Sequence, residues 1–71
     1  MNPPETAASC CLELAGDALE TAARLIALNA LAAEGAARRG DEGECFARLR
    51  AVAETLDEAQ DIVRLAGGIS R

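Results

Sequence analysis

The segment "RRGDEGE", which runs from Arg38 to Glu44, constrains the fold more than any other feature of the chain. Arg38 and Arg39 place positive charge where it meets the negative end of a helix dipole, and Gly40 suits the left-handed position that closes many helices. Asp41, followed three residues later by Glu44, matches an Asp-type variant of the capping box that starts a helix. We therefore predict that one helix ends here and a second begins after a turn at residues 40–41.

The segment before this turn is expected to form a single helix over residues 5–39. Pro3 and Pro4 suit a first helical turn, which Asn2 or a nearby residue could cap. The chain is rich in alanine and has one aromatic residue, a balance that favours helix and argues against a sheet.

The segment after the turn is expected to form a second helix over residues 42–66. The glycine pair at 67–68 would end this helix, with Arg64 in its last turn. A connection this short makes the two helices antiparallel neighbours. The predicted fold is all-α: a single coiled-coil-like antiparallel two-helix hairpin over residues 1–71, which completes a bundle with a second copy or with a partner protein.

Apolar residues recur every seven positions along both segments, as they do where helices pack in a coiled coil. The two columns of the first helix are Leu12, Leu19, Ile26, Ala33 and Ala15, Ala22, Asn29, Ala36. The two columns of the second helix are Leu49, Leu56, Val63 and Val52, Ala59, Ala66. Folding about residue 41 would place Ala33 near Leu49, Ile26 near Leu56, Leu19 near Val63 and Leu12 near Ile69.

The segment "LIALNALAA", residues 25–33, is apolar at every position except Asn29. The second helix can cover only one side of it, and a helix that is apolar all round is buried all round. We therefore expect another chain, either a second copy or a different protein, to cover the rest. The expected partner-binding residues are Leu14, Leu25, Leu28, Asn29 and Leu31. Asn29 also falls on a core column, where a polar residue can fix the register of the helices, so a hydrogen bond to the partner is the alternative to a structural role.

Charge and composition argue against several classes of function. The net charge of −5 disfavours nucleic acid and anionic membranes as partners. No segment approaches the roughly 20 apolar residues of a membrane span, and the N-terminus lacks the pattern of a signal peptide. The charged back of the second helix is expected to be a solvated face. We accordingly expect a cytoplasmic protein.

No catalytic site or metal site is predicted. The chain has no histidine, so neither a nucleophile–base pair nor the commonest zinc ligand is available, and we expect no enzyme activity, cofactor or metal. Cys10 and Cys11 are read as small apolar side chains, because adjacent helical positions diverge by about 100°. Cys45 lies at the other end of the hairpin, so no disulfide within the chain is expected.

The region "RRGDEGECFARLRAVAETLDEAQDIVRLAGG", residues 38–68, resembles the YscE/PscE-type co-chaperones of type III secretion needle subunits. The likeness lies in a basic residue and glycine at the turn, an acidic start to the second helix, the step Leu56–Asp57–Glu58–Ala59 and an Ala-Gly end. Members of the family carry aromatic residues in the second helix, where this chain offers only Phe46. The resemblance implies a cytosolic protein that binds a tetratricopeptide (TPR)-like chaperone and helps keep the needle subunit monomeric before export.

A second interpretation remains open, in which the chain self-associates into a homodimeric four-helix bundle and serves as an adaptor or regulator of another system. An RNA-binding bundle is disfavoured, because the arginines near the turn are accompanied by Asp41, Glu42 and Glu44.

Overall fold

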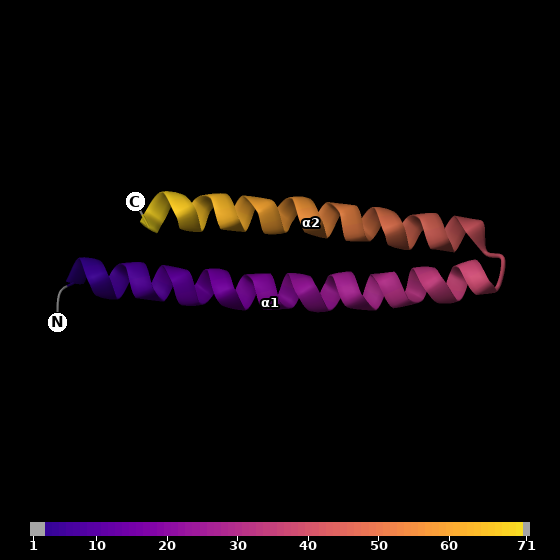
Figure 1. Ribbon diagram of the computed structural model, residues 1–71, viewed down its shortest axis with the longest axis horizontal. Helices are drawn as coiled ribbons and strands as arrows, with labels where there is room; N and C mark the ends of the chain where they lie inside the picture. The colour runs from indigo at the N-terminus through magenta and orange to yellow at the C-terminus, as the bar shows by residue number, and fades with distance from the viewer. Residues whose placement is uncertain (1–2, 71) are drawn as a thin grey trace.

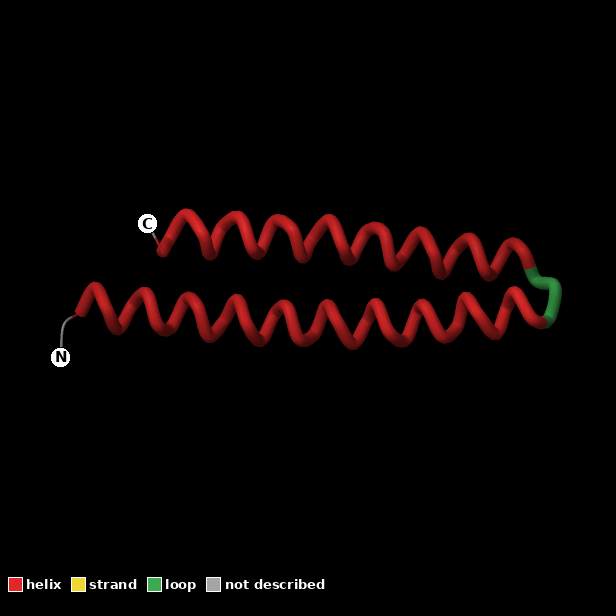
Figure 2. Tube along the Cα trace, in the orientation of Figure 1, coloured by secondary structure: helices red, strands yellow, loops and turns green. Residues whose placement is uncertain are grey.

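The computed structural model describes residues 3–70, with side chains described between residues 10 and 68. It is an all-α hairpin of two helices, α1 (Pro3–Arg38) and α2 (Glu42–Ser70), which run antiparallel along each other (Figures 1 and 2). The Cα trace extends over 57 × 16 × 9 Å, so the hairpin is a single flat rod in which the start of α1 and the end of α2 lie at the same end (Figure 1). Over the residues described, neither helix carries an apolar stretch sufficient to cross a lipid bilayer.

The turn closes through backbone hydrogen bonds around Gly40. This glycine has φ +74°, the left-handed conformation expected of it from the sequence. The Gly40 N–H donates to the Ala37 carbonyl at 3.0 Å, and the Asp41 N–H donates to the Ala36 carbonyl at 2.9 Å. These two bonds form a Schellman motif, which satisfies carbonyls that the end of α1 would otherwise leave free.

Asp41 also starts α2, but only half of the expected capping box forms. The Glu44 N–H donates to Asp41 Oδ1 at 3.1 Å, which caps the first turn of α2. In a full box the Glu44 carboxylate would accept from the Asp41 N–H. That N–H is already bonded to Ala36, and Glu44 Oε1 instead accepts from Arg48 Nε at 2.7 Å.

The outer ends of both helices differ from the predicted bounds. α1 begins at Pro3, and the proposed cap Asn2 lies outside the described residues. α2 continues through the Gly67–Gly68 pair to Ser70, so Arg64 is not in its last turn. Gly40 is the one described glycine with positive φ, so Gly67 and Gly68 keep helical backbone and do not close the helix.

The seam between the helices consists largely of small side chains. Its buried residues are Ala22, Ala33, Ala36 and Thr55. Half-buried residues beside them include Ala15, Leu19, Ile26 and Asn29 on α1, and Val52, Ala59, Ile62 and Ala66 on α2. No described side chain larger than alanine is fully buried, so the hairpin alone has little hydrophobic core.

One of the four predicted seam columns is wrong. Leu49, Leu56 and Val63 are about half exposed, at 47%, 48% and 58%. Thr55 and Ile62, each one residue earlier than a member of that column, lie in the seam instead. Thr55 is small, and its hydroxyl is satisfied by donating to the Ala51 carbonyl at 2.9 Å, so it allows a close approach of helices lined by alanine. The bulkier Leu49 and Leu56 therefore lie beside the seam, on the flank of α2.

The alignment of the two helices also differs from the prediction, by about one helical turn. A fold about residue 41 sets Asn29 level with Ala53, whereas Asn29 Oδ1 accepts a hydrogen bond from Arg48 Nη1 at 3.1 Å. The Schellman bond explains the shift, because it folds Asp41 back onto Ala36 before the chain starts α2. The predicted contact of Leu12 with Ile69 involves a side chain outside the described ones.

Candidate partner-binding surface

Four leucines of α1 lie on its surface and are covered by α2 partly or not at all. We call Leu14, Leu25, Leu28 and Leu31 the outer leucines. Their exposed fractions are 68%, 44%, 65% and 66% in that order. Single exposed leucines are ordinary on soluble proteins, but several on one helix mark a surface suited to a partner.

The spacing of the outer leucines makes three of them neighbours. Leu25, Leu28 and Leu31 follow one another at steps of three residues, which brings side chains together on a helix surface. They pass from the edge of the seam, at Leu25, round to the outer side of α1, at Leu31. Leu14 shares the column of Leu28 and lies about 21 Å away along the axis, given a rise of 1.5 Å per residue. The arrangement offers a helix ridge that an apolar groove could accept.

Asn29 is placed differently from the four leucines with which the sequence groups it. Its side chain is half-buried in the seam, where its Nδ2 donates to the Leu25 carbonyl at 2.9 Å and its Oδ1 accepts from Arg48. Arg48 in turn is held by Glu44. This geometry fits the structural interpretation, in which Asn29 fixes the register of the hairpin, better than the alternative of a hydrogen bond to a partner, because its amide is already engaged within the chain.

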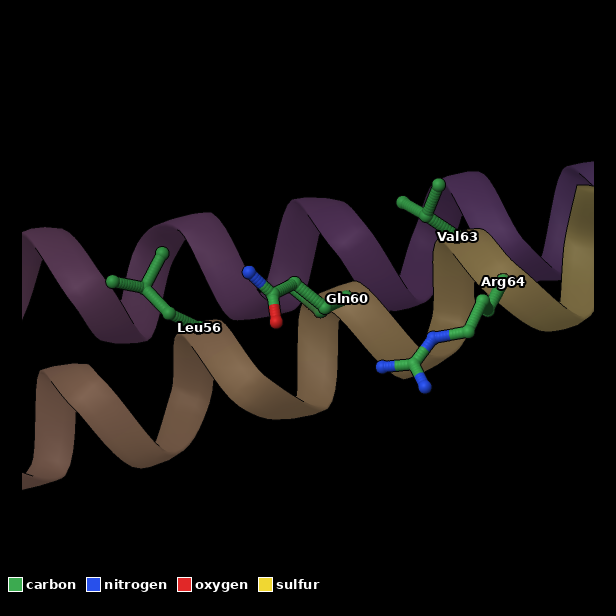
Figure 3. A pocket seen from close by; sticks show the side chains of 5 residues that line it. Leu56, Gln60, Val63 and Arg64 are labelled. Atoms are coloured by element: carbon green, nitrogen blue, oxygen red, sulfur yellow. The ribbon is translucent and has the colours of Figure 1, made fainter.

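A second apolar surface, missed by the sequence reasoning, runs along α2. Leu49, Leu56 and Val63 lie on the flank of this helix with Phe46, which is 65% exposed. A shallow hollow there is lined by Leu56, Ala59, Gln60, Val63 and Arg64. Figure 3 shows Leu56, Gln60 and Val63 in a row along the edge of α2 that borders α1. The signal that could have found this surface is a second heptad row, residues 46, 49, 53, 56, 60 and 63, beside the seam column.

Most charged residues of α2 lie on its remaining side, although Arg64 also borders the hollow of the second apolar surface. Arg50, Glu54, Asp57, Glu58, Asp61 and Arg64 are all exposed, as the sequence predicts. The ion pair of Arg64 with Asp61 (3.0 Å) is highly exposed, as is the pair of Arg24 with Glu20 (2.6 Å) on α1. Exposed pairs of this kind contribute little to stability. They keep parts of the hairpin solvated and leave the apolar surfaces as the places where a partner can bind.

The three thiols are divided between the two ends of the rod. Cys10 and Cys11 lie near the open end and Cys45 lies in the first turn of α2, and all three are free. Among the described residues, no group of three or more His, Cys, Asp or Glu side chains is placed to hold a metal ion.

Comparison with known proteins does not assign a family. No protein-family model, curated protein or solved structure matches the chain. The likeness to the needle co-chaperones therefore stays a prediction from the sequence.

Proposed function

We propose that this chain is a protein-binding subunit and, more specifically, a small cytoplasmic co-chaperone of a type III secretion system. In this role it binds a TPR-like chaperone, and the pair keeps the needle subunit monomeric before export. The observation that carries the proposal is the exposure of Leu28 and Leu31, together with Leu14 and Leu25, on a helix whose other side already packs against α2.

The physical argument for binding is the favourable free energy of moving these exposed leucine side chains out of water. Burying a leucine fully contributes about 1.5–3 kcal/mol relative to leaving it exposed. A helix that presents apolar residues at steps of three and four suits a groove between helices, and TPR-like repeats form such grooves. The flat rod also leaves the full length of α1 accessible from outside (Figure 1).

The resemblance over residues 38–68 gives the proposal its biological setting. Those residues form the turn and almost all of α2, while the outer leucines lie on α1. The two observations are thus independent of each other: the resemblance suggests the system, and the exposed ridge suggests the surface.

The alternative function is a homodimeric four-helix bundle that serves as an adaptor or regulator elsewhere. The observation in its favour is the second apolar surface, along Leu49, Leu56 and Val63. Genes beside this one discriminate between the two, because genes of a secretion apparatus on both sides are expected only for the co-chaperone.

The test is co-expression with the TPR-like protein encoded nearest to this gene and measurement of their affinity. Leu28→Asp would place an unpaired charge in the contact and is expected to weaken binding by about 2 kcal/mol or more, roughly thirtyfold in Kd. Ala47→Asp is the matched control, because it adds the same charge at an exposed alanine of α2. A wild-type chain that does not bind, or a Leu28→Asp variant that binds as tightly as Ala47→Asp, would contradict the proposal.

A further inference from the structure

One broad side of the hairpin, which we call the uncharged face, has no charged residue in its α2 row between residues 46 and 63, while Glu42 and Arg64 lie at its edges. The α2 row consists of Phe46, Leu49, Ala53, Leu56, Gln60 and Val63. Their steps alternate between three and four residues, the spacing of a helix seam that packs against other helices. The structure leaves this row exposed, so it is a seam without a partner inside the chain.

The adjoining row of α1 is uncharged as well, and the outer of its two columns contains small side chains. Leu12, Leu19 and Ile26 form its inner column, and Gly16, Ala23 and Ala30 form its outer column. The two rows belong to the same side of the rod, since Ala37, at the end of the outer column, and Phe46 line one hollow near the turn, together with Glu42. Leu14 and Leu65 line a different hollow, which opens at the other end. In an antiparallel helix pair, residues that follow the seam at equivalent heptad positions of the two helices lie on the same side of the rod. Phe46 and Ala37 therefore share one side, and Leu14 and Leu65 share the other.

The exposed area shows how much surface remains to be covered. The chain exposes 5350 Å². A compact monomer of its mass, 7.3 kDa, exposes about 4,200 Å² by the scaling of folded proteins, which is roughly 1,200 Å² less. A stable interface removes about 800 Å² from each partner. The excess is therefore enough for one complete protein interface.

We propose that the uncharged face binds a second copy of this chain, giving an antiparallel four-helix bundle. The face is complementary to itself, because its α2 row is bulky and the outer column of its α1 row is glycine and alanine. A two-fold axis along the rod places α2 of each copy over α1 of the other, so that large side chains meet small ones. Every helix then has antiparallel neighbours, as in up-and-down bundles.

Charge agrees with this occupant. Each copy has a net charge of −5, which would oppose association if carboxylates met across the contact. The rows contain none between residues 46 and 63 of α2, Glu42 lies at the turn end of the α2 row, where it lines a hollow with Phe46, and the other acidic residues of α2 lie outside the rows. The outer leucines Leu28 and Leu31 also stay outside the bundle. The inference therefore goes beyond the co-chaperone proposal, and binding of a chaperone at those leucines can succeed or fail independently of it; for the alternative function it specifies which face joins the two copies.

The direct test is sedimentation equilibrium of the purified chain alone. The wild type is expected at twice the chain mass of 7.3 kDa. Leu56→Asp is expected to weaken the dimer about a hundredfold or more, since a two-fold interface contains the change twice. Leu28→Asp, which alters an equally exposed or more exposed leucine on another side, is expected to leave the dimer intact.

A second pair of variants tests the arrangement on the α1 side. Ala23→Arg introduces a large charged group where the small column accepts the bulky row of the other copy, and it is expected to give monomers. Thr21→Arg is its control, because Thr21 is exposed on the same helix and lies two residues from Ala23, about 160° round the helix axis and so away from this face. The control is expected to remain dimeric.

A measurement on the wild type keeps the proposal testable if the variants fail to fold. The melting temperature of a dimer rises with protein concentration, whereas that of a monomeric hairpin does not. A wild type that is monomeric at high micromolar concentration would overturn the proposal and leave the face to a different protein. A dimer that survives Leu56→Asp, or that Leu28→Asp dissociates instead, would also overturn it.

Discussion

Two places in this hairpin carry similar helix-ending signals, and only one of them ends a helix. At the turn, Gly40 follows two arginines; near the C-terminus, Gly67 follows Arg64 by three residues and is itself followed by another glycine. Gly40 adopts φ +74° and the chain reverses, while Gly67 and Gly68 stay within α2.

The difference lies in the hydrogen bonds that surround each glycine. At the turn, the N–H groups of Gly40 and Asp41 satisfy two α1 carbonyls, and the Asp41 carboxylate caps the next helix. Gly68 is followed directly by Ile69, whose side chain has no polar group that could act as Asp41 does, and two glycines in a helix cost only about 1 kcal/mol each relative to alanine. Glycine therefore permits a helix to end, and the polar groups that follow it decide whether the helix does so.

The largest effect is expected from Gly40→Ala. A side chain in the left-handed region costs roughly 1–2 kcal/mol, and nothing lies within 4 Å of the added Cβ, so the cost comes from the backbone alone. Urea unfolding followed by circular dichroism, at one fixed protein concentration, should show this loss. Gly40→Asn should lose less, because asparagine tolerates the left-handed region. Equal stability of Gly40→Ala and the wild type would mean that the turn does not need positive φ.

Removal of the cap tests the other half of the turn. Asp41→Ala deletes the acceptor of the Glu44 N–H and is expected to lower the free energy of unfolding by about 1 kcal/mol. Asp41→Asn keeps an acceptor oxygen and should retain most of the stability. If both variants lose the same amount, the carboxylate charge rather than the hydrogen bond is the stabilising feature.

The turn could be predicted from the sequence because its determinants are local. Arg38, Gly40, Asp41 and Glu44 lie within seven residues, and each acts on backbone groups next to it in the chain. Even there the prediction of a full capping box was wrong, because the Asp41 N–H donates to Ala36 in the Schellman motif and is not available to the Glu44 carboxylate.

The packing of α2 could not be predicted in the same way. Three adjacent columns of this helix contain apolar residues, and heptad spacing alone favours the column with the largest side chains, that of Leu56. Which column faces α1 depends on how closely two alanine-lined surfaces can approach, and here Thr55 is buried instead. The exposure of Leu28 and Leu31 was expected, since both lie off the seam columns of α1, but what covers them stays a prediction.

Gly67→Ala tests the region in which the helix continues. Because Gly67 has helical backbone and nothing lies within 4 Å of an added Cβ, alanine should raise the free energy of unfolding by about 0.4–1 kcal/mol. Helical signal at 222 nm should rise with it. The sign is opposite to that expected at Gly40, although the substitution is the same. A loss of stability at Gly67 would place the end of α2 before this residue and remove the contrast between the two regions.

The smallest expected effect is a difference in stability between variants of Arg38 and Arg64, both of which the sequence places in the last turn of a helix. Arg38 lies in the last turn of α1 and pairs with Glu34, whereas Arg64 pairs with Asp61 six residues before the end of α2. Both pairs are exposed and contribute only about 0.2–1 kcal/mol. Arg38 gains in addition from the negative end of its helix dipole, an effect that falls off within the last turn and so does not reach Arg64.

Arg38→Ala should therefore cost a few tenths of a kcal/mol more than Arg64→Ala at low salt, roughly the lower range of a dipole contribution. The difference should disappear in 1 M salt, where screening acts over about 3 Å. Equal losses at low salt would mean that the helix ends at the same distance beyond both arginines, contrary to the continuation of α2 through Gly67 and Gly68.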